Sequence, residues 1–171
     1  MPSEPTTRLR HVDPARRRGR VYRGYAAFAA GPVGRAFSTK VAWKLDPHLL
    51  KLTRGRFGMA FPLPTALLET RGARSGAPRT NALIYFHDGA KVTIIASKLG
   101  LDHHPAWYHN LRKNPDVAFG GIPMRAEVVE DRTERHRLWA LADRVYPPYE
   151  AYRRDAALAD REIPIVQLTE R

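Results

Sequence analysis

Apolar and polar residues alternate in several short runs after residue 60, with the two-residue period that is typical of half-buried strands. Turn residues separate these runs. Asp88-Gly89, for example, suits a hairpin turn because both residues adopt positive φ readily. A basic loop joins the first two runs, and Gly120-Gly121 joins a later pair. The predicted strands cover residues 65–70, 81–86, 91–97, 117–119, 124–130 and 163–168.

Helical patterns interrupt these strands at three places. Pro105 begins the first helix and Asn114-Pro115 ends it, because proline fits a first turn and cannot continue a helix. Residues 132–145 form an amphipathic helix, and residues 149–160 form another. Hairpins mixed with a few helices indicate an α+β fold, and no internal repeat is visible.

The first part of the chain has a different pattern. Residues 1–19 are polar and rich in arginine, which favours a disordered basic arm. Residues 20–54 place aromatic and apolar residues at helical spacing between Arg and Lys, including a short helix that begins at Asp46-Pro47 and ends at Gly55. This basic amphipathic segment suits either a membrane interface or packing on the body. The folded domain is then expected over residues 55–171.

The charge distribution follows the same division. The chain has 171 residues and a formal net charge of +12, and residues 1–60 hold 13 Lys or Arg against three acids. The excess fits a solvated tail, or attraction to nucleic acid or to an anionic membrane. The uncharged stretch over residues 24–34 is too short for a bilayer that needs ~20 residues, and no signal peptide is evident. We therefore expect a cytoplasmic protein, with peripheral contact at the inner face of the membrane as a hypothesis.

The residues between Thr70 and Asn81 carry the first candidate chemistry. They form a loop rich in Gly, Ser and Arg, which exposes backbone N–H groups and guanidinium groups together, as phosphate sites do. Trp107 and Asn110, three apart on the following helix, suit a flat heterocycle. The pattern indicates half of a site for a phosphorylated ring cofactor. A solvated hairpin tip is the structural alternative.

Other candidates have structural alternatives as well. Lys98 follows a strand on which Ser97 is expected to share one face with Thr93, and a strand-end Lys often only reaches solvent. Trp107 also fits a core anchor. The tyrosines of the Tyr146–Tyr152 segment fit pocket walls with hydrogen-bonded hydroxyls.

Several chemistries lack support in the sequence. The chain has no cysteine, so disulfides and thiolate metal sites are excluded. The spacing of His103, His104 and His109 does not match the two-histidine zinc motif, and we expect no metal. There is no G-x-S-x-G elbow, G-x-G-x-x-G motif or Walker loop, so hydrolase and Rossmann functions are not indicated.

Five motifs in one order resemble the signature of the deazaflavin-dependent nitroreductase family, and the similarity runs from about Leu45 to Leu168. The resemblance implies a split β-barrel of the flavin-binding type, related to flavin reductases and pyridoxamine-phosphate oxidases, with flanking helices. The motifs are Gly72-x-Arg74-Ser75-Gly76-x-Pro78-Arg79-x-Asn81, Ala96-Ser97-Lys98, Pro105-x-Trp107-Tyr108-x-Asn110-Leu111-x-x-Asn114-Pro115, Tyr146-Pro-x-Tyr149-x-x-Tyr152 and Ile163-Pro164-Ile165-Val166.

The resemblance also implies an activity. A member of this family is an oxidoreductase that transfers a hydride from reduced 8-hydroxy-5-deazaflavin, coenzyme F-420, to a flat acceptor such as a quinone or a nitroaromatic. The implied catalytic or pocket residues are Ser97, Tyr146, Tyr149 and Tyr152. The implied cofactor-binding residues are Arg74, Ser75, Gly76, Arg79, Asn81, Ala96, Ser97, Lys98, Ala106, Trp107 and Asn110.

Two positions depart from the family pattern. The family commonly has a second basic residue where this chain has Ala73, and some members have a pocket tyrosine where it has Ile84. Two alternative functions stay open. One is a reductase of the same fold that uses flavin mononucleotide (FMN). The other is a non-catalytic protein that binds anions or nucleic acid through its basic arm.

Overall fold

Six strands form a closed antiparallel barrel in the order β1-β2-β3-β6-β5-β4. The computed structural model describes residues 9–16, 19–22, 24, 28 and 63–171. Each strand is bonded to its two neighbours, so the barrel has no free edge, which is how β-proteins avoid unpaired backbone groups. The strands are β1 (Thr65–Arg71), β2 (Pro78–Asp88), β3 (Lys91–Ile95), β4 (Asp116–Phe119), β5 (Ile122–Val128) and β6 (Ile165–Glu170).

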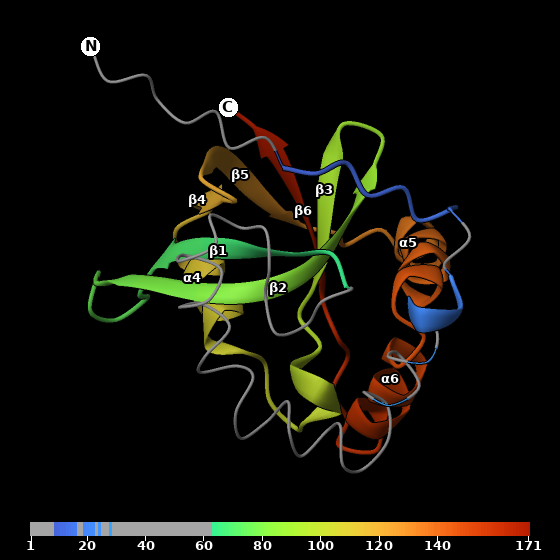
Figure 1. Ribbon diagram of the computed structural model, residues 1–171. Coiled ribbons are helices and arrows are strands. Elements are labelled where there is room, and N and C mark those ends of the chain that lie inside the picture. Colours follow the sequence, from blue (N-terminus) through green and yellow to red (C-terminus); the bar gives the residue numbers. More distant parts are fainter. Residues whose placement is uncertain (1–8, 17–18, 23, 25–27, 29–62) are drawn as a thin grey trace.

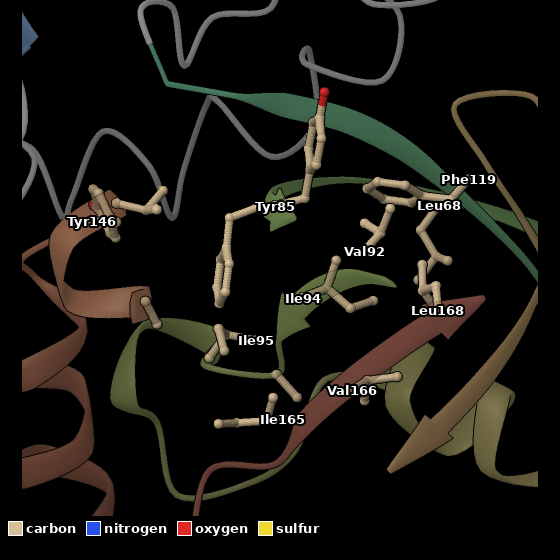
Figure 2. Packing of buried hydrophobic residues seen from close by; sticks show 14 of the residues in the cluster. Leu68, Tyr85, Val92, Ile94, Ile95, Phe119, Tyr146, Ile165, Val166 and Leu168 are labelled. Carbon is tan, nitrogen blue, oxygen red and sulfur yellow. The ribbon is translucent and has the colours of Figure 1, made fainter. Parts of the chain in front are cut away.

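The barrel interior is filled by alternate side chains of the strands. Leu68 of β1, Phe119 of β4, Val92 of β3 and Leu168 of β6 lie close together, all nearly inaccessible to solvent (Figure 2). Burial of such side chains is the main favourable contribution to folding. The two-residue alternation of the sequence therefore corresponds to the inner and outer surfaces of the barrel.

Within residues 63–171, the barrel is flanked by α4 (Ala106–Lys113), α5 (Arg132–Val145) and α6 (Tyr149–Ala157). α4 lies beside the β1–β2 hairpin, whereas α5 and α6 lie together on another side (Figure 1). The Asp131 carboxylate accepts a 2.7 Å hydrogen bond from the Glu134 amide and so caps α5. A short 3₁₀ turn, η2 (Lys98–Gly100), packs against α6.

The N-terminal residues that the structure describes contact strand β2. Val12 is buried, and its carbonyl accepts a 2.9 Å hydrogen bond from the His87 amide on β2. The Tyr85 hydroxyl donates a 2.8 Å bond to the Arg10 carbonyl, and burial raises the Tyr85 pKa to about 12. Residues 9–16 therefore lie against β2 through backbone and side-chain hydrogen bonds and one buried apolar side chain.

The region after residue 19 also contacts the body. Tyr22 is buried and its hydroxyl donates a hydrogen bond to the carbonyl of Val145 at the end of α5. This contact agrees with the packing alternative for that residue. The short helix expected between Asp46 and Gly55 lies outside the described residues.

The other predicted elements match the structure closely. The helix over 132–145 is confirmed at both ends, and the strands agree within a few residues, except that β3 ends at Ile95 rather than Ser97. The α+β barrel with flanking helices is also confirmed. Within the described part of the chain, no helix is long and apolar enough to cross a membrane.

Candidate functional site

The basic loop between β1 and β2 is a compact turn rather than an open tip. The Gly72 amide donates to the Ala77 carbonyl and the Gly76 amide donates to the Gly72 carbonyl, each at 2.8 Å. A Cβ on Gly72 would lie 2.9 Å from the Ser75 hydroxyl, so a larger residue there would displace the Ser75 side chain. Gly76 has a φ of 67°, which glycine adopts without strain.

Asn110 of α4 fixes this loop to the body. Its side-chain oxygen accepts a 2.9 Å hydrogen bond from the Ala73 amide, and its side-chain nitrogen donates a 3.1 Å bond to the Thr70 hydroxyl. Both Asn110 and Thr70 are buried. Because the amide holds the loop on one side and the strand on the other, the loop keeps its place relative to α4.

The charged side chains of the loop point outward. Arg74 and Arg79 are exposed, and neither forms an ion pair with another of the described residues. Beside them, the Lys113 ammonium donates a 2.7 Å hydrogen bond to the Ala73 carbonyl. A shallow groove of about 590 Å³ runs here, lined by Ala73, Tyr108, His109, Arg112 and Lys113.

A second group of predicted residues follows the end of β3. Ala96 donates its amide to the Pro164 carbonyl at 3.0 Å, and the chain then turns sharply through η2. Lys98 and Leu99 have φ values of 45° and 58°, which non-glycine residues rarely adopt. Ser97 therefore does not share a strand face with Thr93, contrary to the sequence expectation, because the strand ends before it.

The Lys98 side chain is half-buried in a positive environment. Burial lowers the pKa of its ammonium group, the nearby charge of Arg161 lowers it further, and the Asp102 carboxylate opposes both effects. A cation in such surroundings gains from an anionic partner. The phosphate of a cofactor is a partner of that kind.

Arg161 is a buried residue that the sequence analysis did not single out. Its guanidinium donates to the carbonyls of Ala96, Ser97 and Leu101, and its Nε donates to His104 Nδ1 at 3.1 Å. Only 6% of the residue is exposed. The surrounding sequence, Asp160-Arg161-Glu162, reads as a solvated charged run and gives no signal of this burial.

The three predicted tyrosines lie together on and before α6. The hydroxyls of Tyr146 and Tyr152 are 3.3 Å apart, and the rings of Tyr146 and Tyr149 contact each other with centroids at 5.0 Å. All three residues are buried. Burial, followed by the charges of its neighbours, raises the pKa of Tyr149, so its hydroxyl stays protonated. The arrangement is a packed aromatic wall with a hydroxyl pair inside it.

The remaining predicted cofactor-binding residues, on α4 and β2, differ in their exposure to solvent. Trp107 is buried on α4, whereas Ala106 is exposed at the first position of that helix. Asn81 is half-buried on β2, opposite Leu68 of β1.

The structure thus forms two clusters, which are joined by α4. The loop cluster consists of residues 72–79 with Asn110, and the turn cluster consists of residues 96–100 with the tyrosines. His104 connects them, since it accepts from Arg161 and its ring contacts Tyr108 of α4 at 4.9 Å. Cations occur in both clusters, which fits an elongated ligand with more than one anionic group. Among the described residues, no three histidines or carboxylates are grouped as a metal site would require.

Comparison with known protein families agrees with a site that has cations in both clusters. The profile of the "F420H(2)-dependent quinone reductase" family matches residues 44–170 of the chain. The chain therefore belongs to this family, and it is an oxidoreductase whose cofactor is coenzyme F-420. The expected family resemblance, enzyme class and cofactor are confirmed.

Individual relatives support the same assignment. An F420H(2)-dependent quinone reductase of Mycobacterium tuberculosis is 36% identical over 135 residues, which is 75% of this chain and 89% of the relative. Among solved structures, an F420-H2 dependent reductase is 35% identical with a TM-score of 0.53, over 61% of this chain and 93% of that one. Another, described as a domain-swapped dimer, is 29% identical with a TM-score of 0.55, over 81% of this chain and 99% of that chain.

Proposed function

We propose that this oxidoreductase holds the phosphate and acidic tail of coenzyme F-420 with Arg74, Arg79 and Lys98. One observation carries the proposal: the exposed arginines of the loop have no ion-pair partner in the described part of the chain, while Asn110 fixes the loop that bears them. A guanidinium group binds phosphate and carboxylate through two parallel hydrogen bonds, so a fixed pair of arginines is well suited to this ligand.

Lys113 provides a replacement for the basic residue that the family has at the position of Ala73. Its ammonium group lies at the Ala73 carbonyl, so a cation is present beside the loop although residue 73 is neutral. In this proposal the tail of the coenzyme follows the groove between the loop and the last turn of α4. Asn81, Ala106 and Trp107 then contact the central part of the coenzyme.

Reduced F-420 supplies a hydride from carbon 5 of its ring. The protein binds and orients the reactants. Ser97 and the tyrosine wall of residues 146, 149 and 152 border the acceptor pocket, and a hydroxyl there stabilises the negative charge that develops on the acceptor oxygen. Because the Tyr149 pKa is raised, its hydroxyl is a hydrogen-bond donor at neutral pH rather than a base.

The acceptor in this proposal is a quinone, and a flat nitroaromatic is a second candidate. Both are planar, electron-poor rings whose oxygens gain negative charge during reduction. Ile84 is half-buried where some relatives have a pocket tyrosine, and an aliphatic side chain at that position favours acceptors with an apolar ring substituent.

The test is a fluorescence titration of the protein with oxidised F-420. Arg79→Ala and Lys98→Ala should each raise the dissociation constant about tenfold, since each removes a charge-assisted contact. The matched control is Arg132→Ala, an exposed arginine on α5, which should bind as the wild type does. Unchanged affinity in both test variants would remove the anchoring role of these residues.

Reduction assays then separate binding from turnover. Tyr152→Phe removes one hydroxyl and keeps the ring. We expect it to lower the rate of quinone reduction more than the affinity for F-420. A rate equal to that of the wild type would exclude the Tyr152 hydroxyl from the reaction. A parallel titration with FMN tests the alternative flavin.

We also propose peripheral membrane contact through residues 1–54. Val21 and Phe28 are exposed large apolar side chains in a segment rich in arginine, and this combination favours an anionic lipid surface. Flotation with vesicles that contain anionic lipid should recover the full-length protein. Replacement of both Val21 and Phe28 by serine should reduce that recovery, and equal recovery would contradict the proposal.

A further inference from the structure

The turn that carries Lys98 is held by the side chain of Arg161, which lies more than 60 residues later in the sequence. Four of the five N–H groups of the Arg161 guanidinium are used within this region. Three carbonyls of the turn, those of Ala96, Ser97 and Leu101, accept from its Nη atoms. The arginine therefore spans the whole turn from its first residue to its last, and it contacts the backbone rather than Lys98 itself.

The backbone of Arg161 is hydrogen-bonded to helix α6. Its amide donates a 3.0 Å hydrogen bond to the Ala156 carbonyl in the last turn of α6. The same helix carries Tyr152, whose backbone contacts the turn from another side: a Cβ on Gly100 would lie 2.8 Å from the Tyr152 carbonyl oxygen. The turn is thus fixed between a helix backbone and a buried cation.

The turn needs such support because of its backbone conformation. Lys98, Leu99 and Gly100 have φ values of 45°, 58° and 78° in succession. Two of these are not glycine, and each such residue costs about 1 kcal/mol or more in this region. The conformation also brings the carbonyls of Ala96, Ser97 and Leu101 within reach of one side chain, and the buried carbonyl of Ala96 needs a donor from the protein. A planar guanidinium with several diverging N–H groups can bond all three, whereas a lysine ammonium lacks that geometry.

We propose that Arg161 is a positioning residue for the F-420 site. It holds the strained turn so that the Lys98 ammonium meets the anionic group of the coenzyme. This inference rests on the proposed role of Lys98. Arg161 does not touch the coenzyme in this scheme, and its effect on binding passes through the turn.

The contact with His104 extends the effect of Arg161 to α4. Because the arginine Nε is always a donor, His104 accepts at Nδ1 and its proton is on Nε2. His104 lies two residues before α4, which carries Asn110 and through it the basic loop. Arg161 therefore holds the turn cluster and the start of α4 in one fixed relation.

A double-mutant cycle tests this inference, with the dissociation constant of oxidised F-420 as the readout. Arg161→Gln in the wild-type background should raise the constant about tenfold, because the turn no longer presents Lys98. In a Lys98→Ala background the same substitution should change it less than about twofold, since the group that Arg161 positions is already missing. Equal effects in both backgrounds would overturn the proposal.

Arg161→Lys is the second variant, for the case in which glutamine prevents folding. Lysine keeps the positive charge but lacks the planar guanidinium that bonds several carbonyls. A positioning role therefore predicts that Arg161→Lys weakens F-420 binding, and that this loss disappears in the Lys98→Ala background. Full wild-type affinity in a folded Arg161→Lys protein would contradict the role of the guanidinium geometry. Arg135→Met is the matched control. Arg135 pairs with Glu162 and donates to the Ile163 carbonyl but does not contact the turn, so its loss should leave the affinity unchanged.

Hydrogen exchange separates this inference from the proposed function, because it needs no coenzyme. The amides of Gly100 and Leu101 donate to Ser97 and Lys98 carbonyls at 3.0 and 3.1 Å. Both should exchange faster in Arg161→Gln than in the wild type or in Arg135→Met. Faster exchange with no effect of Lys98→Ala on affinity would mean that the turn is held as stated but Lys98 is not a ligand. Unchanged exchange would overturn the positioning role.

Discussion

The arginines of the loop cluster and the arginine beside the turn cluster have different surroundings. In the loop cluster, Arg74 and Arg79 are exposed, and the described part of the chain offers them no ion-pair partner. Beside the turn cluster, Arg161 is buried and donates to three carbonyls and a histidine. All three residues are arginines, but within the residues that the structure describes only Arg161 has hydrogen-bond partners that use most of its guanidinium N–H groups.

The difference separates ligand binding from structural support. A solvated guanidinium contributes little to folding and keeps its hydrogen-bonding capacity for an anion. A buried guanidinium has used that capacity within the protein, and its removal leaves several polar groups unsatisfied. We therefore expect substitutions in the loop to alter affinity and substitutions at Arg161 to alter stability as well.

The largest effect is expected for Arg161→Met. Loss of the guanidinium removes a donor from the carbonyls of Ala96, Ser97 and Leu101, of which that of Ala96 is buried, and should lower the free energy of unfolding by about 3 kcal/mol. Arg79→Met should change it by less than about 0.5 kcal/mol, because that side chain is exposed. Urea denaturation of both variants measures the difference. Similar losses would remove the distinction between the two regions.

Gly100→Ala tests the support of the turn from the side of α6. Gly100 has a φ of 78° and an added Cβ would meet the Tyr152 carbonyl, so we expect a loss of about 2 kcal/mol. The control is Gly89→Ala, where φ is 59° but a Cβ would have open space. Its loss should be only about 1 kcal/mol. Thermal unfolding compares the two, and equal shifts would show that the contact with Tyr152 contributes nothing.

Asn110→Ala weakens the attachment of the loop cluster. It leaves the Ala73 amide and the Thr70 hydroxyl without their partner, which should cost about 1.5 kcal/mol of stability. Affinity for F-420 should fall too, because the arginines lose their fixed position. Asn114→Ala, at the end of the same helix, is the control. If affinity were the same in both variants, the loop would not need this attachment for binding.

The smallest effect is expected from pH. Burial, then the charges of Arg161 and His109, lower the pKa of His104 from its ordinary value of 6.5. The folded protein then binds fewer protons than the unfolded chain, so this contribution to stability is complete above about pH 6.5 and is lost as the pH falls below it. Unfolding at about pH 7.5 and about pH 5.5 should show a weaker pH dependence in His104→Gln than in the wild type. His136→Gln, on the exposed face of α5, should keep the wild-type dependence.

Local patterns in the sequence were sufficient for much of the fold. The helix over 132–145 follows from helical periodicity, and the hairpin at Asp88-Gly89 follows from turn chemistry. The end of β3 was misjudged, because the apolar pattern continues to Ala96 while the backbone already turns toward η2. The burial of Val12 was missed, since a single apolar residue in a polar segment carries no periodicity.

In the candidate site, too, some residues were predictable from local sequence patterns and others were not. The motif residues of the loop and the tyrosines were identifiable because they are contiguous or lie one helical turn apart. The roles of Asn110 and Arg161 depend on contacts between residues 37 to 65 positions apart, which no local pattern encodes.

The sequence by itself determined the strands, the helices, the excess of positive charge and the family to which the chain belongs, because these depend on residue types and short-range spacing. Tertiary structure alone decided which arginine is buried and which is free for a ligand. Closure of the barrel places the segment after α6 against the turn after β3, and that packing gives Arg161 its carbonyl partners. The task of each charged side chain is therefore set by the groups that folding places around it.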